Sequence, residues 1–289
     1  MTDQDIRLGD NQYGKAETRL VRVDRGGDRH VVTDLNVSTA LAGDLSATHL
    51  TGDNAGVLPT DTQKNTVYAF ARDGVGEIEA FALRLARHFV DSTPTIHRAR
   101  VKIEQYRWER IGDRDHSFVR GAGTRTATVT YDGTAATVVS GVDDLVLMNT
   151  TGSEFHGFHN DEYTTLPETH DRILATAVSA RWRHGAAENA DWTGSHHTAC
   201  RHLLDAFADT HSLSLQQTLY AMGEQVLRHR DELVEVRLSL PNKHHFLVDL
   251  SPFELDNPGE VFFAADRPYG LIEGSVVRDG APDAGLAWW

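Results

Sequence analysis

The sequence predicts an α+β protein made of antiparallel strands and separate pairs of helices. Segments with alternating apolar and polar residues come in pairs, and each half of the chain also contains two adjacent segments of helical periodicity. The order strand, strand, helix, helix, strand, strand therefore occurs twice, and this segregation is typical of α+β architecture. No Gly-x-Gly-x-x-Gly follows a predicted strand, which argues against a dinucleotide-binding fold.

The first half begins with a strand pair followed by a helix pair. Residues 18–25 and 29–41 alternate apolar and polar side chains on either side of a Gly-Gly-Asp turn. A helical pattern starts at Thr60, and a second one, with apolar residues from Ile78 to Phe89, ends near Asp91. Two further strands are predicted at residues 98–111 and 125–132.

The second half repeats this layout without a visible sequence repeat. Apolar stripes predict one helix around Leu203 and Phe207 and another from Leu215 to Val226. The predicted strands are residues 136–150, 171–184, 233–240, 244–250 and 271–277.

The length of 289 residues exceeds that of a usual single domain. With the boundary near residue 140, we expect domains at 1–140 and 141–289. Each sheet has free strand edges in an isolated chain, and such edges invite pairing with another subunit. We therefore expect an oligomer that closes the sheets into a barrel.

Composition indicates a globular protein of the cytoplasm. Hydrophobic residues make up 40% and charged residues 24% of the chain. The net charge of −14 argues against nucleic acid or an anionic membrane as the main partner. Neither a secretory signal nor an apolar run of about 20 residues is visible. The single cysteine, Cys200, excludes an internal disulfide and fits a reducing compartment.

Polar residues stand where the first strand and the first helix are predicted to begin. Lys15 follows Gly14 at the start of the strand; it is either a solvated charge or, where burial lowers its pKa, a base. Thr60 and Gln63 have capping-box spacing, and Asp61 suits the helix dipole. Capping explains these residues without a ligand, although a helix start is also a good place to hold an anion.

The segment 151–182 contains an aromatic residue and an arginine in polar surroundings. Phe155 lies among Gly, Ser and His, where it either stacks on a flat ligand or caps the core. Arg172 is predicted to start a strand. Its planar guanidinium group either donates two hydrogen bonds to the acceptor edge of a ligand or pairs with Asp171 or Glu168.

Two further groups of polar residues have open interpretations. Ser214 and Gln217 again have capping-box spacing, which leaves the Gln216 amide free or simply exposed. The sequence NKHH precedes a predicted buried strand, in which Asn242 and His244 would share one side.

The segment HHTACRH resembles half of a zinc site. His196 and Cys200 are four residues apart, and His202 is close by. No second set of ligands has a matching spacing, and one thiol on a helix is usually a small core residue. We therefore predict no metal site.

Taken together, the motifs resemble the urate oxidase (uricase) family over residues 11 to about 277. They are NQYGKAETRL, PTDTQKNTVYAFA, TGSEFHGF, DEYTTLPETHDRILAT, LQQTLY, SLPNKHHFLVDL and DRPYGLIE. The resemblance implies tandem tunnelling-fold (T-fold) domains, dimers that close a barrel, and a homotetramer with active sites at subunit interfaces. It also implies cofactor-independent oxidation of urate by O2 and water to 5-hydroxyisourate and hydrogen peroxide, in purine degradation.

The resemblance implies that one part of the site binds the purine. Phe155 is expected to stack on urate, Arg172 and Gln216 to clamp one edge, and Leu215 to contribute a backbone contact. Leu215 stands where Val is familiar in the family, a change that a backbone contact tolerates.

The resemblance also implies residues for catalysis and residues that a neighbouring chain supplies for substrate binding. Thr60 and Asp61 of that chain are expected to meet the opposite edge of the ligand. Lys15 and Thr60 resemble the base relay, and Asn242 with His244 resembles the group that handles O2 and water. Pro59 stands where Ala is usual, and it restricts Leu58 to extended conformations.

Two alternatives remain open from the sequence. One is another T-fold enzyme that hydrolyses a purine or pterin, usually with zinc. The other is an oligomer that binds purines without turnover. Only a urate oxidase consumes O2 in the presence of urate.

Overall fold

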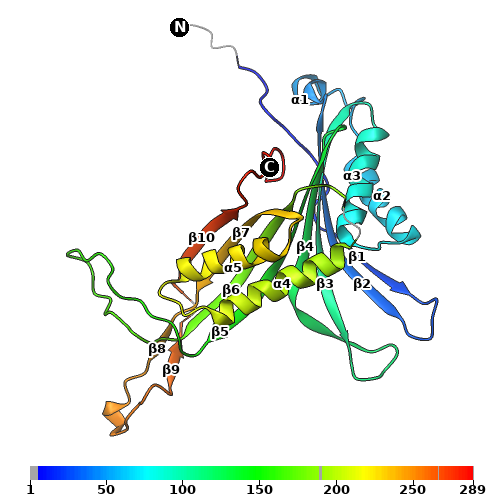
Figure 1. Ribbon diagram of the computed structural model, residues 1–289. Coiled ribbons are helices and arrows are strands. Elements are labelled where there is room, and N and C mark those ends of the chain that lie inside the picture. Colours follow the sequence, from blue (N-terminus) through cyan, green and yellow to red (C-terminus); the bar gives the residue numbers. More distant parts are fainter. Residues whose placement is uncertain (1–5, 189–190, 266, 289) are drawn as a thin grey trace, which may run out of the picture. The chain divides into compact units, whose positions relative to one another are not determined.

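The computed structural model describes residues 6–188, 191–265 and 267–288, and the chain forms two compact units (Figure 1). Within the described residues, the first unit comprises 6–140, 186–188, 191–192 and 283–288. The second comprises Gly141–Gly185 and Thr193–Pro282. Among the helices of the described ranges, none is long and apolar enough to cross a membrane.

The first unit is an antiparallel sheet with a helix pair against one face (Figure 1). Its core helix, α3, packs on the third and fourth strands. Thr18 lies opposite Val37, and Val37 lies opposite Ile103, which sets the register of the first three strands. The elements are β1 (Thr18–Asp24), β2 (Val31–Gly43), α1 (Ser46–Thr51), α2 (Thr60–Asp73), α3 (Ile78–Asp91), β3 (Ile96–Arg110) and β4 (Phe118–Tyr131).

Side-chain alternation explains why this sheet accepts helices on that face. In β3, Val101 and Ile103 are fully buried under α3, whereas Lys102 between them is exposed. Phe81 and Phe89 of α3 are also fully buried. Burial of each such apolar side chain stabilises the fold by about 1.5–3 kcal/mol.

The second unit repeats the arrangement of a helix pair on an antiparallel sheet. Helix α5 packs on β7 and β10, and the contact is close: a Cβ at Gly223 would lie 2.6 Å from Cγ2 of Val276. β5 begins in the first unit and continues into the second. The elements are β5 (Ala136–Asn149), β6 (Leu174–His184), α4 (Trp192–Asp209), α5 (Leu215–His229), β7 (Leu233–Asn242), β8 (His245–Leu247), η1 (Ser251–Phe253), β9 (Phe262–Ala264) and β10 (Gly270–Val277).

The prediction of an α+β fold with antiparallel strands and helix pairs is confirmed. The short helix α1 was not predicted. Of the described residues, the first unit also includes 186–188, 191–192 and 283–288, which the sequence-based ranges assigned to the second half. That the two halves are separate T-fold domains stays a prediction.

The predicted buried strand at 244–250 is wrong. Strand β7 ends at Asn242, and only His245–Leu247 form a strand, which pairs with β9 in a separate two-stranded sheet. Phe246 and Leu247 are 52% and 54% exposed, because no helix described here covers this small sheet. Asn242 and His244 therefore do not share one side of a continuous strand.

A buried ion pair lies in the first unit between α3 and the sheet. The Glu79 carboxylate, fully buried, accepts from Arg125 at 2.7 Å and from the Ser140 hydroxyl at 2.8 Å. Burial raises the pKa of Glu79, while Arg125 and Ser140 counteract that rise. A buried charge of this kind depends on its partners.

We expect Glu79→Ala to lower the free energy of unfolding by about 3–5 kcal/mol, because it leaves the Arg125 guanidinium without its carboxylate. Glu109→Ala is the matched control, since Glu109 pairs with Arg107 at 3.1 Å on the surface. The control substitution should lower the free energy of unfolding by no more than about 1 kcal/mol. Guanidinium denaturation of both variants measures the difference, and equal stabilities would contradict the importance of the buried pair.

Candidate functional site

The candidate site residues form two groups, one in each unit. Lys15, Thr60 and Asp61 belong to the first unit. The second unit contains the remaining six, which are Phe155, Arg172, Leu215, Gln216, Asn242 and His244.

In the first group, the backbone at Lys15 is hydrogen-bonded to β2. The Thr39 N–H donates to the Lys15 carbonyl at 2.9 Å, and the Lys15 N–H donates to the Thr39 hydroxyl at 3.3 Å. The preceding Gly14 permits this approach, because a Cβ there would lie 1.8 Å from the Thr39 carbonyl oxygen. The chain leading to Lys15 is therefore held against the start of the sheet.

The same threonine connects Lys15 with the start of α2. The Thr39 hydroxyl donates to Oε1 of Gln63 at 2.7 Å, and Nε2 of Gln63 donates to the Leu58 carbonyl at 3.3 Å. Tyr13 adds a second link, since its hydroxyl donates to the Leu58 carbonyl at 3.0 Å. Thr39 and Gln63 are both buried, so these bonds have few competing waters.

The predicted capping box of Thr60 and Gln63 is wrong. The N-cap of α2 is Pro59, no side chain caps the helix, and Thr60 is its first residue. The Gln63 amide is instead engaged with Thr39 and Leu58. Within the described residues the Thr60 hydroxyl is thus not used for capping.

Asp61 is paired within its own helix. Its carboxylate lies 2.5 Å from Nζ of Lys64 and accepts from the Asn65 amide at 3.0 Å. Lys64 lowers the pKa of Asp61 most, and the charge of Lys15 lowers it further. Asp61 therefore carries a negative charge near Lys15 at neutral pH.

In the second group, Phe155 and Arg172 lie together. The Arg172 guanidinium carbon is 5.2 Å from the centre of the Phe155 ring, which stacks on Phe158 at 5.0 Å. Backbone hydrogen bonds in both directions, of 2.8 and 3.0 Å, join Phe155 to Thr169. Phe155 is therefore a partly exposed ring in an ordered strand-like segment, and a cation lies over it.

Arg172 is positioned by a neutral neighbour. Its Nε donates to the Ser153 hydroxyl at 3.2 Å, and its backbone N–H donates to the Ser153 carbonyl at 2.9 Å. Asp171 and Glu168, the predicted alternative partners, instead accept from Thr151 and from the Gly157 N–H. Burial lowers the pKa of Arg172, yet a guanidinium remains charged at neutral pH.

At the start of α5, the capping-box prediction is partly confirmed. The Ser214 hydroxyl accepts from the Gln217 N–H at 3.1 Å, while Oε1 of Gln217 accepts from the Leu213 N–H at 2.8 Å. The Leu215 side chain is buried in the core, so only its backbone is available to a ligand. Gln216 is exposed in the first turn.

Asn242 and His244 lie where the chain leaves the large sheet. Asn242 is opposite Thr176 on one side and Gly270 on the other, and the Lys243 N–H donates to the Ala175 carbonyl at 2.8 Å. Burial lowers the pKa of His244, and the nearby charge of Arg172 lowers it further. His244 is thus neutral at neutral pH and close enough to Arg172 to sense its charge.

The HHTACRH segment does not converge on one point. The Cys200 sulfur is 3.7 Å from Nε2 of His196, but the His202 ring stacks on His229 at 4.4 Å. His202 therefore packs against a different histidine from the one that contacts Cys200.

Sequence reasoning missed the role of Thr39 and misassigned Gln63. Nothing in the local pattern links these residues, which are 24 positions apart and meet only through the packing of α2 on the sheet. A polar residue on the apolar face of α2 was the available signal for a buried Gln63.

We expect Gln63→Leu to lower the free energy of unfolding by about 1–3 kcal/mol, because the buried Thr39 hydroxyl would lose its acceptor and the Leu58 carbonyl one of its two donors. Gln12→Leu, at an exposed position of the same unit, is the control and should change stability by at most about 0.5 kcal/mol. Chemical denaturation measures both. A Gln63→Leu protein as stable as the control would show that the hydrogen bonds of the buried Gln63 amide do not stabilise the fold.

Comparison with known proteins covers nearly the whole chain. The profile of the family described as Uricase matches residues 11–130 and 138–273. The uricase of Arthrobacter globiformis is 53% identical over 281 residues, which are 97% of this chain and 93% of that protein. The uricase of Dictyostelium discoideum is 39% identical over 280 residues, covering 94% and 97% of the two chains.

Solved structures agree with the sequence comparison. The crystal structure of uricase from Arthrobacter globiformis matches with a TM-score of 0.96 at 52% identity, covering 99% of both chains. A urate oxidase from Bacillus sp. TB-90, at 23% identity and a TM-score of 0.82, covers 93% of this chain and 100% of its own and shares the fold. The resemblance carried by the sequence motifs is confirmed, and the chain belongs to the uricase family.

Proposed function

We propose that this protein is a urate oxidase, an oxidoreductase that converts urate, O2 and water to 5-hydroxyisourate and hydrogen peroxide without a metal or organic cofactor. Family membership and one observation support this proposal. Arg172 is a partly buried cation that lies over Phe155 and is held by the neutral Ser153, so its charge is available to an anionic ligand. A flat anion such as urate suits this pair.

Substrate binding is assigned to the second unit. The Phe155 ring stacks on the purine, while the Arg172 fork and the Gln216 amide hold one edge by paired hydrogen bonds. The Leu215 backbone adds a contact that does not depend on its side chain, which is buried. Analogues that leave these groups unpaired lose about 1–3 kcal/mol for each.

Proton removal is assigned to Lys15 and Thr60. Ground-state O2 reacts poorly with closed-shell molecules, so urate must first become more electron-rich by losing a proton. The Thr60 hydroxyl can accept and donate at once, and so it can pass that proton to the Lys15 amine. The Thr39–Gln63 pair holds the backbone segments from which both residues project.

Oxygen and water are assigned to the opposite face of the ring. Asn242 supplies an amide donor to the peroxide anion formed when urate gives two electrons to O2. A water molecule then adds to the oxidised ring. His244, which burial keeps neutral, takes the proton of that water.

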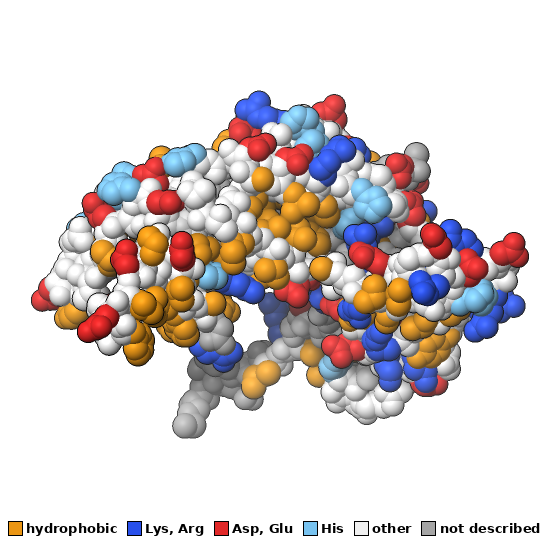
Figure 2. All heavy atoms as spheres, turned by 90° about the horizontal axis from the view of Figure 1, so that it is seen from below, with side chains coloured by type: hydrophobic (Ala, Val, Ile, Leu, Met, Phe, Trp, Pro, Cys, Tyr) orange, Lys and Arg blue, Asp and Glu red, His pale blue; other side chains and the backbone are white. Residues whose placement is uncertain are grey.

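The complete site is proposed to form in a homotetramer, with Thr60 and Asp61 supplied by a neighbouring chain and the sheets closed into barrels. Two observations support an oligomer. Strands β1 and β10 lie at sheet ends, where unpaired backbone groups favour further pairing. Figure 2 shows hydrophobic side chains gathered in patches, with charges of both signs between them. A cytoplasmic location accords with the single cysteine.

An oxygen electrode tests the function. With urate, the purified protein should consume O2 and release an equal amount of peroxide, and the rate should stay unchanged after exhaustive chelation. A zinc-dependent hydrolase would show no O2 uptake and would lose its activity on chelation. Binding of urate without turnover would support a non-catalytic oligomer instead.

We expect Lys15→Met to slow urate oxidation by about 10²–10⁴-fold, the usual contribution of a positioned base. Urate affinity under anaerobic conditions should change little, because the purine contacts lie elsewhere. Lys102→Met is the matched control, since Lys102 is an exposed lysine of the same unit. Near-normal turnover of Lys15→Met would exclude the proposed relay.

A further inference from the structure

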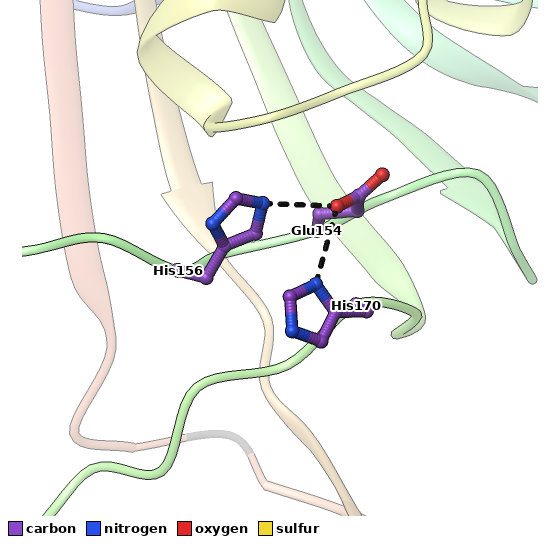
Figure 3. Close-up of side chains that lie close together, drawn as sticks. All are labelled: Glu154, His156 and His170. Carbon is purple, nitrogen blue, oxygen red and sulfur yellow. Dashed lines mark hydrogen bonds and ion pairs between the residues drawn. The ribbon is translucent and has the colours of Figure 1, made fainter.

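We propose that Glu154, His156 and His170 bind a divalent transition-metal ion such as Zn²⁺, at a site next to Phe155 (Figure 3). The proposed oxidation of urate does not use this site. The ion would bind the folded protein without taking part in catalysis. The proposal can therefore be tested independently of the enzymatic activity.

The three side chains already point toward one another. Oε2 of Glu154 lies 3.1 Å from Nε2 of His156 and 3.6 Å from Nδ1 of His170, and one ligand atom from each residue lies within 4.8 Å of the others. In a tetrahedral zinc site with bonds of about 2.0–2.2 Å, neighbouring ligand atoms are about 3.4 Å apart. Small side-chain movements would therefore complete the coordination.

The backbone explains why these ligands converge. Phe155 and Thr169 are opposite each other in an antiparallel bridge. Glu154 and His156 flank Phe155, so in extended chain they project to the same side, opposite to the Phe155 ring. His170 follows Thr169 and is the cross-strand neighbour of Glu154. The ligands thus come from two segments that hydrogen bonds of 2.8 and 3.0 Å hold in register.

A fourth residue orients the carboxylate. Nε2 of His211 lies 2.5 Å from Oε1 of Glu154, the oxygen that the other two histidines do not contact. The Glu154 N–H also donates to the Ser212 carbonyl at 2.7 Å. A metal ligand normally has such an outer partner, which fixes its direction.

The ligand types indicate which ions would bind. Two imidazoles and one carboxylate suit zinc and its neighbours, whereas Ca²⁺ and Mg²⁺ prefer oxygen ligands throughout. The side chains of His156 and His170 are 41% and 73% exposed. An ion could therefore enter from solvent and keep a water molecule as its fourth ligand.

Titration of the untagged, chelator-treated full-length protein with ZnCl₂, followed by calorimetry, tests the proposal. At pH 7.5 we expect about one tight Zn²⁺ per chain and no comparable heat with CaCl₂. His170→Ala should weaken zinc binding at least about tenfold, since it removes one of three ligands. Co²⁺ should give a visible absorption band that this variant lacks.

His97→Ala is the matched control. His97 is an exposed histidine of the first unit that lies 2.9 Å from the Asp44 carboxylate. It therefore reproduces a surface histidine–carboxylate pair that has no further His, Cys, Asp or Glu ligand near it among the residues that the structure describes. Zinc binding should be unchanged in this variant, and circular dichroism should show both variants folded. Absence of saturable zinc binding, or equal binding by His170→Ala and His97→Ala, would overturn the proposal and leave the cluster as ion pairs alone.

Discussion

In both units the sheet must bury one face beneath a helix pair, and most of the structure depends on this constraint. Each strand therefore directs apolar side chains toward the helices and polar ones away, as Val101, Lys102 and Ile103 of β3 do in turn. The ends of strands and helices are free of this requirement. Lys15 before β1, Thr60 at the start of α2 and Asn242 at the end of β7 are such end positions, where polar groups can serve chemistry without weakening the core.

Buried polar groups add a second level of control, because inside the protein they must find partners. Glu79 meets Arg125 across the packing of α3 on the sheet, and Gln63 meets Thr39 across that of α2. Such bonds are strong in a low-dielectric interior and costly to leave unmade. The Gln63 bond connects the backbone at Lys15 with the loop before Thr60. A core interaction thereby positions the backbone of two residues that we propose for proton transfer.

Local patterns predicted much, and their failures have physical causes. Periodicity predicted α3 at its full length, and the motifs identified the uricase family. The Thr-x-x-Gln spacing suggested a cap, but spacing does not reveal burial, and the Gln63 amide is engaged by Thr39 instead. The apolar run after His244 suggested a buried strand, yet among the described strands only β9 pairs with it, and its Phe246 remains exposed. An apolar sequence does not specify what will cover it.

The sequence by itself determined the repeated succession of strand pairs and helix pairs, the α+β class and the family, because periodicity and motif order are properties of neighbouring residues. Only the tertiary structure decided which distant groups meet. It placed Arg172 over Phe155 with Ser153 as its partner, and His211 beside Glu154. These partners are 17 to 57 positions apart, and strand pairing and loop packing bring them together. No local pattern encodes such distances, since they depend on how the whole unit folds.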